Sequence, residues 1–158
     1  MGQQRGVGNE CERLRQVCGP CFAARGRARA RARAELWRRF GVACAGGRVT
    51  ELILANNGLA GTLTSSLGTL GALTRLDLSM NALRGSLPTA LFSLPGLSSL
   101  ILYSNSLSGT LSPAVGGLAG LSYLALYSNK LSGSLPDALG VLRGLVALVL
   151  YENHFTGE

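Results

Sequence analysis

The sequence predicts an α/β solenoid, a stack of similar coils that share one hydrophobic core. Leucines recur in fixed phase with a step of 24 residues over residues 49–158, as at Leu76, Leu100 and Leu124. An asparagine and a glycine recur with the same 24-residue step. A repeat of fixed period indicates stacked coils, because a single coil can bury its apolar side chains only against a neighbour.

Each coil is expected to begin with a short strand. Residues 73–96, which read LTRLDLSMNALRGSLPTALFSLPG, show the unit in full. Leu76 and Leu78 alternate with polar residues, and a period of two indicates a strand with one buried face. Further leucines then mark a return path around the core. The inward positions of this coil are Leu73, Leu76, Leu78, Leu83, Leu87, Leu91 and Leu94.

The asparagine column is interpreted as a structural ladder. A buried amide without partners is costly, and asparagine both donates and accepts hydrogen bonds. Each amide is therefore expected to bond turn backbone in its own coil and in the adjacent coil. The glycine column, which starts at Gly61, is expected to permit a backbone angle or a close approach. The ladder residues are Asn57, Asn81, Asn105, Asn129 and Asn153.

The unit L-x-x-L-x-L-x-x-N-x-L-x-G-x-L-(P) resembles the plant-type leucine-rich repeat, as in receptor-like kinase ectodomains and polygalacturonase-inhibiting proteins. The resemblance covers about residues 34–158. It implies a right-handed leucine-rich-repeat solenoid with a parallel sheet on its concave face and 3-10 helices or loops on its convex face. Thr64 stands where Pro88 stands one repeat later, and Pro113 lies one residue late. The convex turns of those two repeats are therefore expected to differ.

Composition divides the chain into three parts. Residues 1–48 hold 11 of the 15 basic residues and all four cysteines, with a net charge of about +8. Residues 1–33 are predicted to be a basic, cysteine-containing arm, helical or partly disordered, that forms an N-terminal helical extension. Residues 34–48 resemble the N-terminal cap of the family. Residues 49–158 supply four full repeats and a fifth that stops before its return path. We therefore expect a truncated product, with a fragment, or a chain that self-associates through its uncapped C-terminal end, as the alternatives.

The solvent-facing strand positions supply the candidate ligand-binding residues. Adjacent strands lie about 4.8 Å apart, so tyrosines in one column are expected to form an aromatic strip. Tyrosine is frequent in binding hot spots, and we predict that this strip binds a protein or peptide, with a glycan as an alternative. The competing interpretation is a passive cover copied by repeat duplication. The candidate residues are Tyr103, Tyr123, Tyr127, Tyr151, Arg75 and Asp77, the last two interpreted as a solvated charge pair on the concave face.

The cysteines suggest a second function. Cys18-Gly19-Pro20-Cys21 has the C-x-x-C spacing of thiol oxidoreductases, but no strand precedes it to build their sheet. Together with Cys11 and Cys44, the pair could instead close a zinc site. A thiol-redox or metal-binding module in residues 11–44, with the solenoid as a targeting domain, is therefore kept as an alternative. Free thiols or disulfides are the other interpretation.

The arginine-rich run suggests a third function. Residues 22–40 read FAARGRARARARAELWRRF, and their charge could bind phosphates or make weak contact with an anionic membrane. We do not expect nucleic acid as a partner, because the Arg/Ala run carries no interleaved aromatic side chains. A solvated, poorly ordered extension is the competing interpretation.

No catalytic set is visible. The single histidine, His154, has no Ser/His/Asp or paired-carboxylate pattern near it, and the glycines follow the repeat rather than a phosphate-binding fingerprint. We therefore predict a non-catalytic recognition or signalling module without a cofactor. No signal peptide or membrane span is visible, which leaves the compartment unassigned, cytoplasmic by default. The resemblance allows an extracellular or membrane-attached protein if the chain is a fragment.

Overall fold

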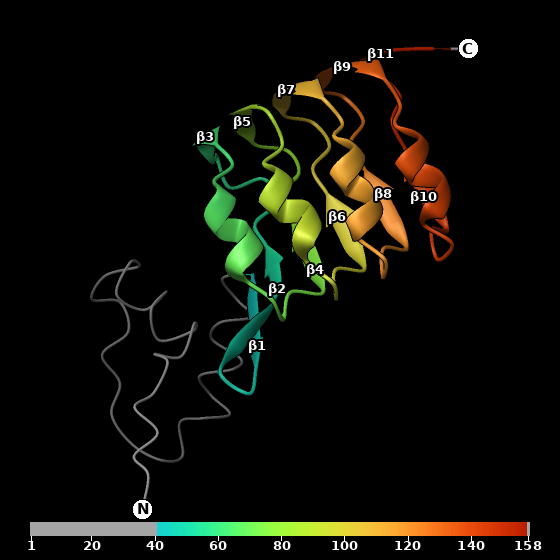
Figure 1. Ribbon diagram of the computed structural model, residues 1–158. Coiled ribbons are helices and arrows are strands. Elements are labelled where there is room, and N and C mark those ends of the chain that lie inside the picture. Colours follow the sequence, from blue (N-terminus) through green and yellow to red (C-terminus); the bar gives the residue numbers. More distant parts are fainter. Residues whose placement is uncertain (1–40, 158) are drawn as a thin grey trace, which may run out of the picture.

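The computed structural model describes residues 41–157, which form a stack of coils (Figure 1). The predicted right-handed solenoid is confirmed. The helical extension, the basic arm and the run of residues 22–40 lie outside the described residues.

One sheet takes a strand from every coil. Its order is β1-β2-β4-β6-β8-β10, with β1 antiparallel to β2 and every other pair parallel. Neighbouring strands pair with a 24-residue step, as Leu76 does with Leu100, so all inward leucines share one face. The predicted parallel sheet is therefore present. Its strands are β1 (Val42–Ala45), β2 (Arg48–Ile53), β4 (Arg75–Asp77), β6 (Ser99–Ile101), β8 (Tyr123–Ala125) and β10 (Ala147–Val149).

A second sheet of five parallel strands runs along another side of the stack, which the sequence analysis did not anticipate (Figure 1). The glycine column lies in it. Gly133 has a φ of +78°, and a Cβ there would lie 2.9 Å from Cγ2 of Thr110 on the preceding strand. Glycine thus lets adjacent coils approach closely. The strands are β3 (Ala60–Thr62), β5 (Ala82–Gly85), β7 (Ser106–Thr110), β9 (Lys130–Ser134) and β11 (His154–Thr156).

The convex side carries one 3-10 helix per full repeat. The four helices each contain five residues and keep the same place in their coils, and the expected difference appears only in the third repeat, at the N-cap of its helix. Adjacent helices pack on one another, and this packing can hold the turn without a proline at a fixed position. In the third repeat, Ser112 caps the helix by accepting a hydrogen bond from the Ala114 amide at 3.2 Å. The helices are η2 (Ser65–Thr69), η3 (Thr89–Ser93), η4 (Pro113–Gly117) and η5 (Asp137–Val141).

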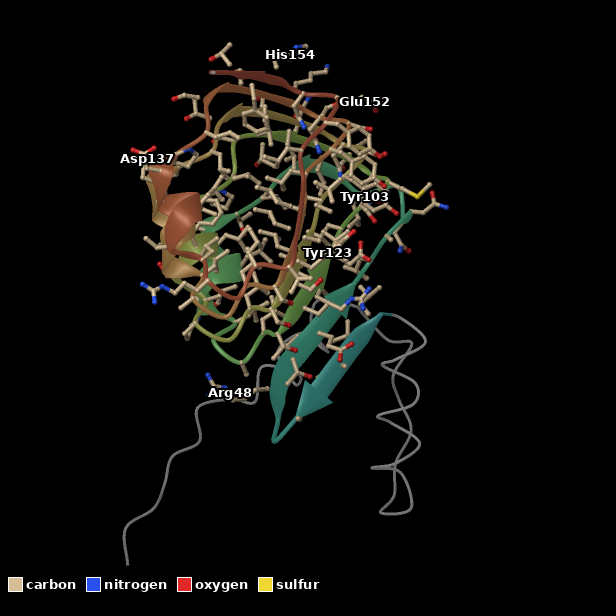
Figure 2. The ribbon with its side chains drawn as sticks, turned by 90° about the vertical axis from the view of Figure 1, so that its right-hand side faces the viewer. Arg48, Tyr103, Tyr123, Asp137, Glu152 and His154 are labelled. Carbon is tan, nitrogen blue, oxygen red and sulfur yellow. The ribbon has the colours of Figure 1, made fainter. Side chains whose placement is uncertain are left out.

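The core lies inside the coils, enclosed by the two sheets and the 3-10 helices (Figure 2). All seven inward leucines of the second coil are buried. The equivalent positions of the fifth coil are less covered, since Leu148 is 41 % exposed whereas Leu124 is fully buried. Burial of these leucines against the next coil is the main stabilising term of the stack.

Asparagine side chains join each coil to the one before it. The Asn105 side chain accepts a hydrogen bond from the Leu83 amide at 3.0 Å. Its amide nitrogen donates to the carbonyl of Leu78 in the preceding coil at 3.0 Å and to that of Leu102 in its own coil at 3.1 Å. Asn81, Asn129 and Asn153 make the same set of bonds. Asn57, in the first coil, is exposed and its side-chain amide bonds only Ala55 among the described residues.

A second column of side-chain bonds uses hydroxyls. Thr74, Ser98 and Ser122 each donate a hydroxyl hydrogen to the carbonyl oxygen 24 residues earlier, at 2.9 to 3.0 Å. The fifth coil breaks the column, because Val146 occupies the equivalent position and is 88 % exposed. This column recurs with the same period as the leucines, so the sequence contained the signal.

Replacement of Asn105 by leucine should destabilise the fold although leucine is more apolar. The change leaves the Leu83 amide and the Leu78 and Leu102 carbonyls without this partner. We expect a loss of about 2–4 kcal/mol in the free energy of unfolding, measured by urea denaturation. Asn57→Leu is the matched control and should cost less than about 1 kcal/mol, since the side-chain amide of Asn57 bonds only Ala55 of its own coil among the described residues. Equal losses in the two variants would contradict the structural role of the inter-coil bonds.

Val146→Thr should stabilise the protein. Its hydroxyl can donate to the Ser122 carbonyl, which already accepts the Val146 amide at 2.8 Å, and the change removes exposed apolar surface. We expect a gain of about 0.5–1 kcal/mol in the free energy of unfolding. Ser122→Ala should lower the free energy of unfolding by a similar amount. A Val146→Thr variant that is less stable than the parent would contradict the stabilising role of the hydroxyl column.

Candidate binding surface

Three tyrosines form a continuous stack at the edge of the concave sheet, each two residues beyond the end of its strand. The ring centroids of Tyr103 and Tyr127 lie 4.4 Å apart with 6° between the ring planes, and those of Tyr127 and Tyr151 lie 4.6 Å apart with 18°. Figure 2, which looks along the stack of coils, places Tyr103 on the side of the molecule opposite Asp137 of η5. We call Tyr103, Tyr127 and Tyr151 the tyrosine stack.

The asparagine bonds position the stack. Each tyrosine is followed by a residue with a left-handed backbone and then by an inter-coil asparagine; Ser104, for example, has a φ of +52°. Asn105 donates a hydrogen bond to the carbonyl of Tyr103 at 3.3 Å, and the Ser104 amide donates to that of Tyr127 at 3.0 Å. The left-handed residue between them changes the direction of the backbone, so that asparagine points inward while tyrosine faces outward. Ring spacing is therefore set by coil spacing.

The surface beside the stack is closely packed. Ile101 and Ala125 occupy the neighbouring solvent-facing column, yet both are buried. Tyr123, on the far side of Ala125 along β8, is 38 % exposed and has no ring contact among the described residues. The flanking side chains therefore cover the strands, while Tyr103 and Tyr127 are half-buried and Tyr151 is exposed.

The stack is an uncharged surface at neutral pH. Desolvation by the neighbouring side chains raises the pKa of Tyr127 above its usual value of 10.0, and the phenols of Tyr103 and Tyr151 raise it further. A phenol with a raised pKa keeps its proton and can donate a hydrogen bond. A side-chain hydrogen bond with Tyr103 also raises the pKa of Tyr127, so part of the hydrogen-bonding capacity of the phenols is used within the stack.

The Arg75–Asp77 pair differs from the expectation of a solvated pair. Asp77 is only 8 % exposed, and its carboxylate accepts hydrogen bonds from the amide and the hydroxyl of Ser79, at 3.2 and 2.7 Å. Arg75 lies 3.7 Å from the other carboxylate oxygen, and its side chain is 45 % exposed. Asp77 can be buried because Arg75 and Ser79, in its own coil, compensate the charge of its carboxylate. Only Arg75 remains accessible to a ligand.

Glu152 adds a charge that the sequence analysis did not select. It follows Tyr151 directly, is exposed, and accepts a hydrogen bond from the hydroxyl of Ser128. Among residues 41–157, no cation lies in ion-pair contact with it. Figure 2 shows Glu152 and Tyr103 toward the same side of the molecule. The equivalent positions hold Asn56, Met80, Ser104 and Ser128, so no glutamate recurs in this column.

The residues proposed for the alternative functions fall mostly outside the described part. Cys11, Cys18, Cys21 and the arginine-rich run belong to residues 1–40. Cys44, on β1, is disulfide-bonded. In that state it has no thiolate with which to bind zinc. Within residues 41–157, no cluster of His, Cys, Asp or Glu could hold a metal ion, and His154 is an exposed side chain on β11. The same part of the chain contains no helix with the length and apolar character to cross a bilayer.

Comparisons with known proteins agree with the fold. A family model described as a leucine-rich repeat matches residues 47–107, and another with the same description matches residues 120–142. A search of curated proteins found no match. Solved structures do match. In the complex of BIR3 with SERK2 from Arabidopsis thaliana, the aligned chain is 38 % identical, with a TM-score of 0.73 over 77 % of this chain and 66 % of that one.

Two further structures extend this likeness. The leucine-rich-repeat ectodomain of the receptor kinase SOBIR1 from Arabidopsis thaliana is 36 % identical, with a TM-score of 0.70 over 74 % of this chain and 68 % of that one. The Arabidopsis receptor kinase HAESA, solved with the peptide hormone IDA and the co-receptor SERK1, is 38 % identical, with a TM-score of 0.59 over 61 % of this chain and 16 % of the other. The chain thus spans about two thirds of the shorter ectodomains.

The raised pKa of Tyr127 should be visible in an alkaline titration. Because this pKa lies above the unfolded value, the unfolded chain loses the proton first, and the free energy of unfolding falls as pH rises through the folded pKa. This contribution is fully present below the unfolded pKa. We expect one phenol to ionise after the others, followed by phenolate absorbance, and Tyr127→Phe to remove that late component. Loss of an early component instead would show that the stack does not shift the pKa.

Proposed function

This chain belongs to the plant-type leucine-rich-repeat family, and we propose that it is a non-catalytic module that binds a protein or peptide on its concave face. The observation that carries the proposal is the tyrosine stack. It places three aromatic rings in a continuous row at the edge of the concave sheet. A rigid aromatic row loses little conformational entropy on binding, which favours it as the centre of an interface.

The related structures support a macromolecular partner. BIR3 is solved in complex with SERK2, and HAESA with a peptide hormone and a co-receptor. These partners belong to those proteins. For this chain they support a recognition or signalling role, and they support protein or peptide as the ligand class.

The orientation of the rings favours a peptide over a glycan. Sugars pack on the open faces of aromatic rings, whereas both faces of Tyr127 are covered by Tyr103 and Tyr151. The stack offers ring edges and hydroxyls instead. A polypeptide can place apolar side chains against those edges and its carbonyls against the hydroxyls. Arg75, which is partly exposed in the second coil, and Tyr123 would extend the same surface. In this proposal Asp77 orients Arg75 and does not touch the ligand.

Selection from an unbiased peptide-display library tests the proposal. Peptides enriched on the parent protein should bind Tyr127→Ala at least ~10-fold more weakly, since removal of a central aromatic anchor costs more than about 1.4 kcal/mol. Arg84→Ala, an exposed change on β5 of the second sheet, is the matched control and should bind as the parent does. Circular dichroism of each variant verifies that the fold is retained.

Two outcomes would overturn the proposal. One is an enriched peptide whose affinity is the same for Tyr127→Ala and the parent. The other is a peptide whose binding depends on Arg84 and not on the tyrosines, which would place the binding surface on the second sheet.

A further inference from the structure

We infer that the ligand of the tyrosine stack is a proline-rich segment in the polyproline II conformation, flanked by a basic residue that pairs with Glu152. The inference rests on the proposed function and names the class of peptide. Three features of the described residues support it: the length of the stack, its hydrogen-bonding groups and the charge at its end.

The length of the stack matches one turn of polyproline II. The two centroid separations, 4.4 and 4.6 Å, together span about 9 Å from Tyr103 to Tyr151. Polyproline II rises about 3.1 Å per residue with three residues per turn, so equivalent groups recur every ~9.3 Å along one side. A β-strand repeats every ~6.7 Å on one face, and an α-helix every ~5.4 Å. Neither a β-strand nor an α-helix therefore places equivalent groups about 9 Å apart on one side.

The hydrogen-bonding groups also match. Polyproline II has no internal hydrogen bonds, so its carbonyls are free to accept. Proline supplies no amide hydrogen, and a proline-rich segment is therefore mainly an acceptor. The phenols of Tyr103 and Tyr151 can donate to these carbonyls, whereas the Tyr127 phenol is in a side-chain hydrogen bond with Tyr103. A preformed polyproline II helix also loses little entropy when it binds an aromatic surface.

Charge fixes the flanking residue. Glu152 lies next to Tyr151, the most exposed ring of the stack, and its carboxylate is engaged only by the hydroxyl of Ser128 among the described residues. The stack itself is uncharged. Because the Glu152 carboxylate reaches back to Ser128, the negative charge lies beside the part of the stack formed by Tyr127 and Tyr151. An uncharged proline segment with a lysine or arginine beside that part therefore complements both parts of the surface.

Three synthetic peptides of equal length test the inference. The first carries consecutive proline-rich turns followed by arginine, the second replaces arginine with glutamine, and the third replaces every proline with glycine. Dissociation constants are measured by fluorescence anisotropy with the full chain. The parent should bind the first peptide at least ~10-fold more tightly than the glycine peptide, and ~3- to 10-fold more tightly than the glutamine peptide.

Variants separate the two parts of the inference. Glu152→Gln should abolish the preference for arginine over glutamine and keep the preference for proline over glycine. Tyr127→Ala should weaken binding of both proline peptides, and Arg84→Ala should change neither. Equal affinity of the parent for the proline and glycine peptides overturns polyproline II recognition. An arginine preference that persists in Glu152→Gln overturns the role of that carboxylate.

The two proposals can fail separately. Library-selected peptides that bind through Tyr127, with no preference for proline in the synthetic panel, would leave the peptide-binding function and remove the polyproline II class. Library-selected peptides that do not depend on Tyr127 would remove the peptide-binding function of this surface together with the inference built on it.

Discussion

The side-chain amide that bridges adjacent coils is the interaction on which both the fold and the candidate site depend. Each bridging asparagine, such as Asn105, bonds backbone in two coils at the point where the chain leaves the concave sheet. Without it, the inward turn would bury unpaired amides and carbonyls. The same asparagine bonds the carbonyl of the tyrosine two residues earlier. One residue thus sets the spacing of the coils, and this spacing in turn sets the spacing of the rings.

Much of the fold could be predicted because the solenoid is nearly one-dimensional. The 24-residue step of the leucines predicts the strands of the concave sheet and the stacking direction. The glycine column and the leucines before it, such as Leu83 and Leu107, recur with the same step in the second sheet, but these segments are too short to show the alternation that marks a strand. The strands of this sheet, such as Ser106–Thr110, are short and rich in serine and glycine, and they form because the preceding turn delivers each segment alongside its neighbour. The 3-10 helices keep their place although the prolines shift, since packing between neighbouring turns holds them.

The candidate site was predictable in position and less so in environment. The alternation along each strand places Tyr103, Tyr127 and Tyr151 outward in one column, and no long-range information is needed for that. Ring orientation and burial depend on neighbours in three dimensions. Asp77 occupies an outward position and is nevertheless covered, because Arg75 and Ser79 bond it and Ile101 lies in the next coil. Glu152 was not predicted because no glutamate recurs in its column, which holds serine in the third and fourth coils.

The variation among coils argues against a stack that is only a by-product of duplication. Leu-Tyr-Ser-Asn occurs at residues 102–105 and again at 126–129, so these two copies alone are explained equally well by duplication. The fifth coil differs from both. It has Glu152 in place of serine and Val146 in place of the hydroxyl, yet it keeps Tyr151. Tyr151 is 58 % exposed and contributes little to the core, so core packing alone gives no physical reason to retain it. Under the polyproline II proposal, a ligand that contacts all three rings supplies that reason, because an aromatic row of two would be too short for one polyproline II turn.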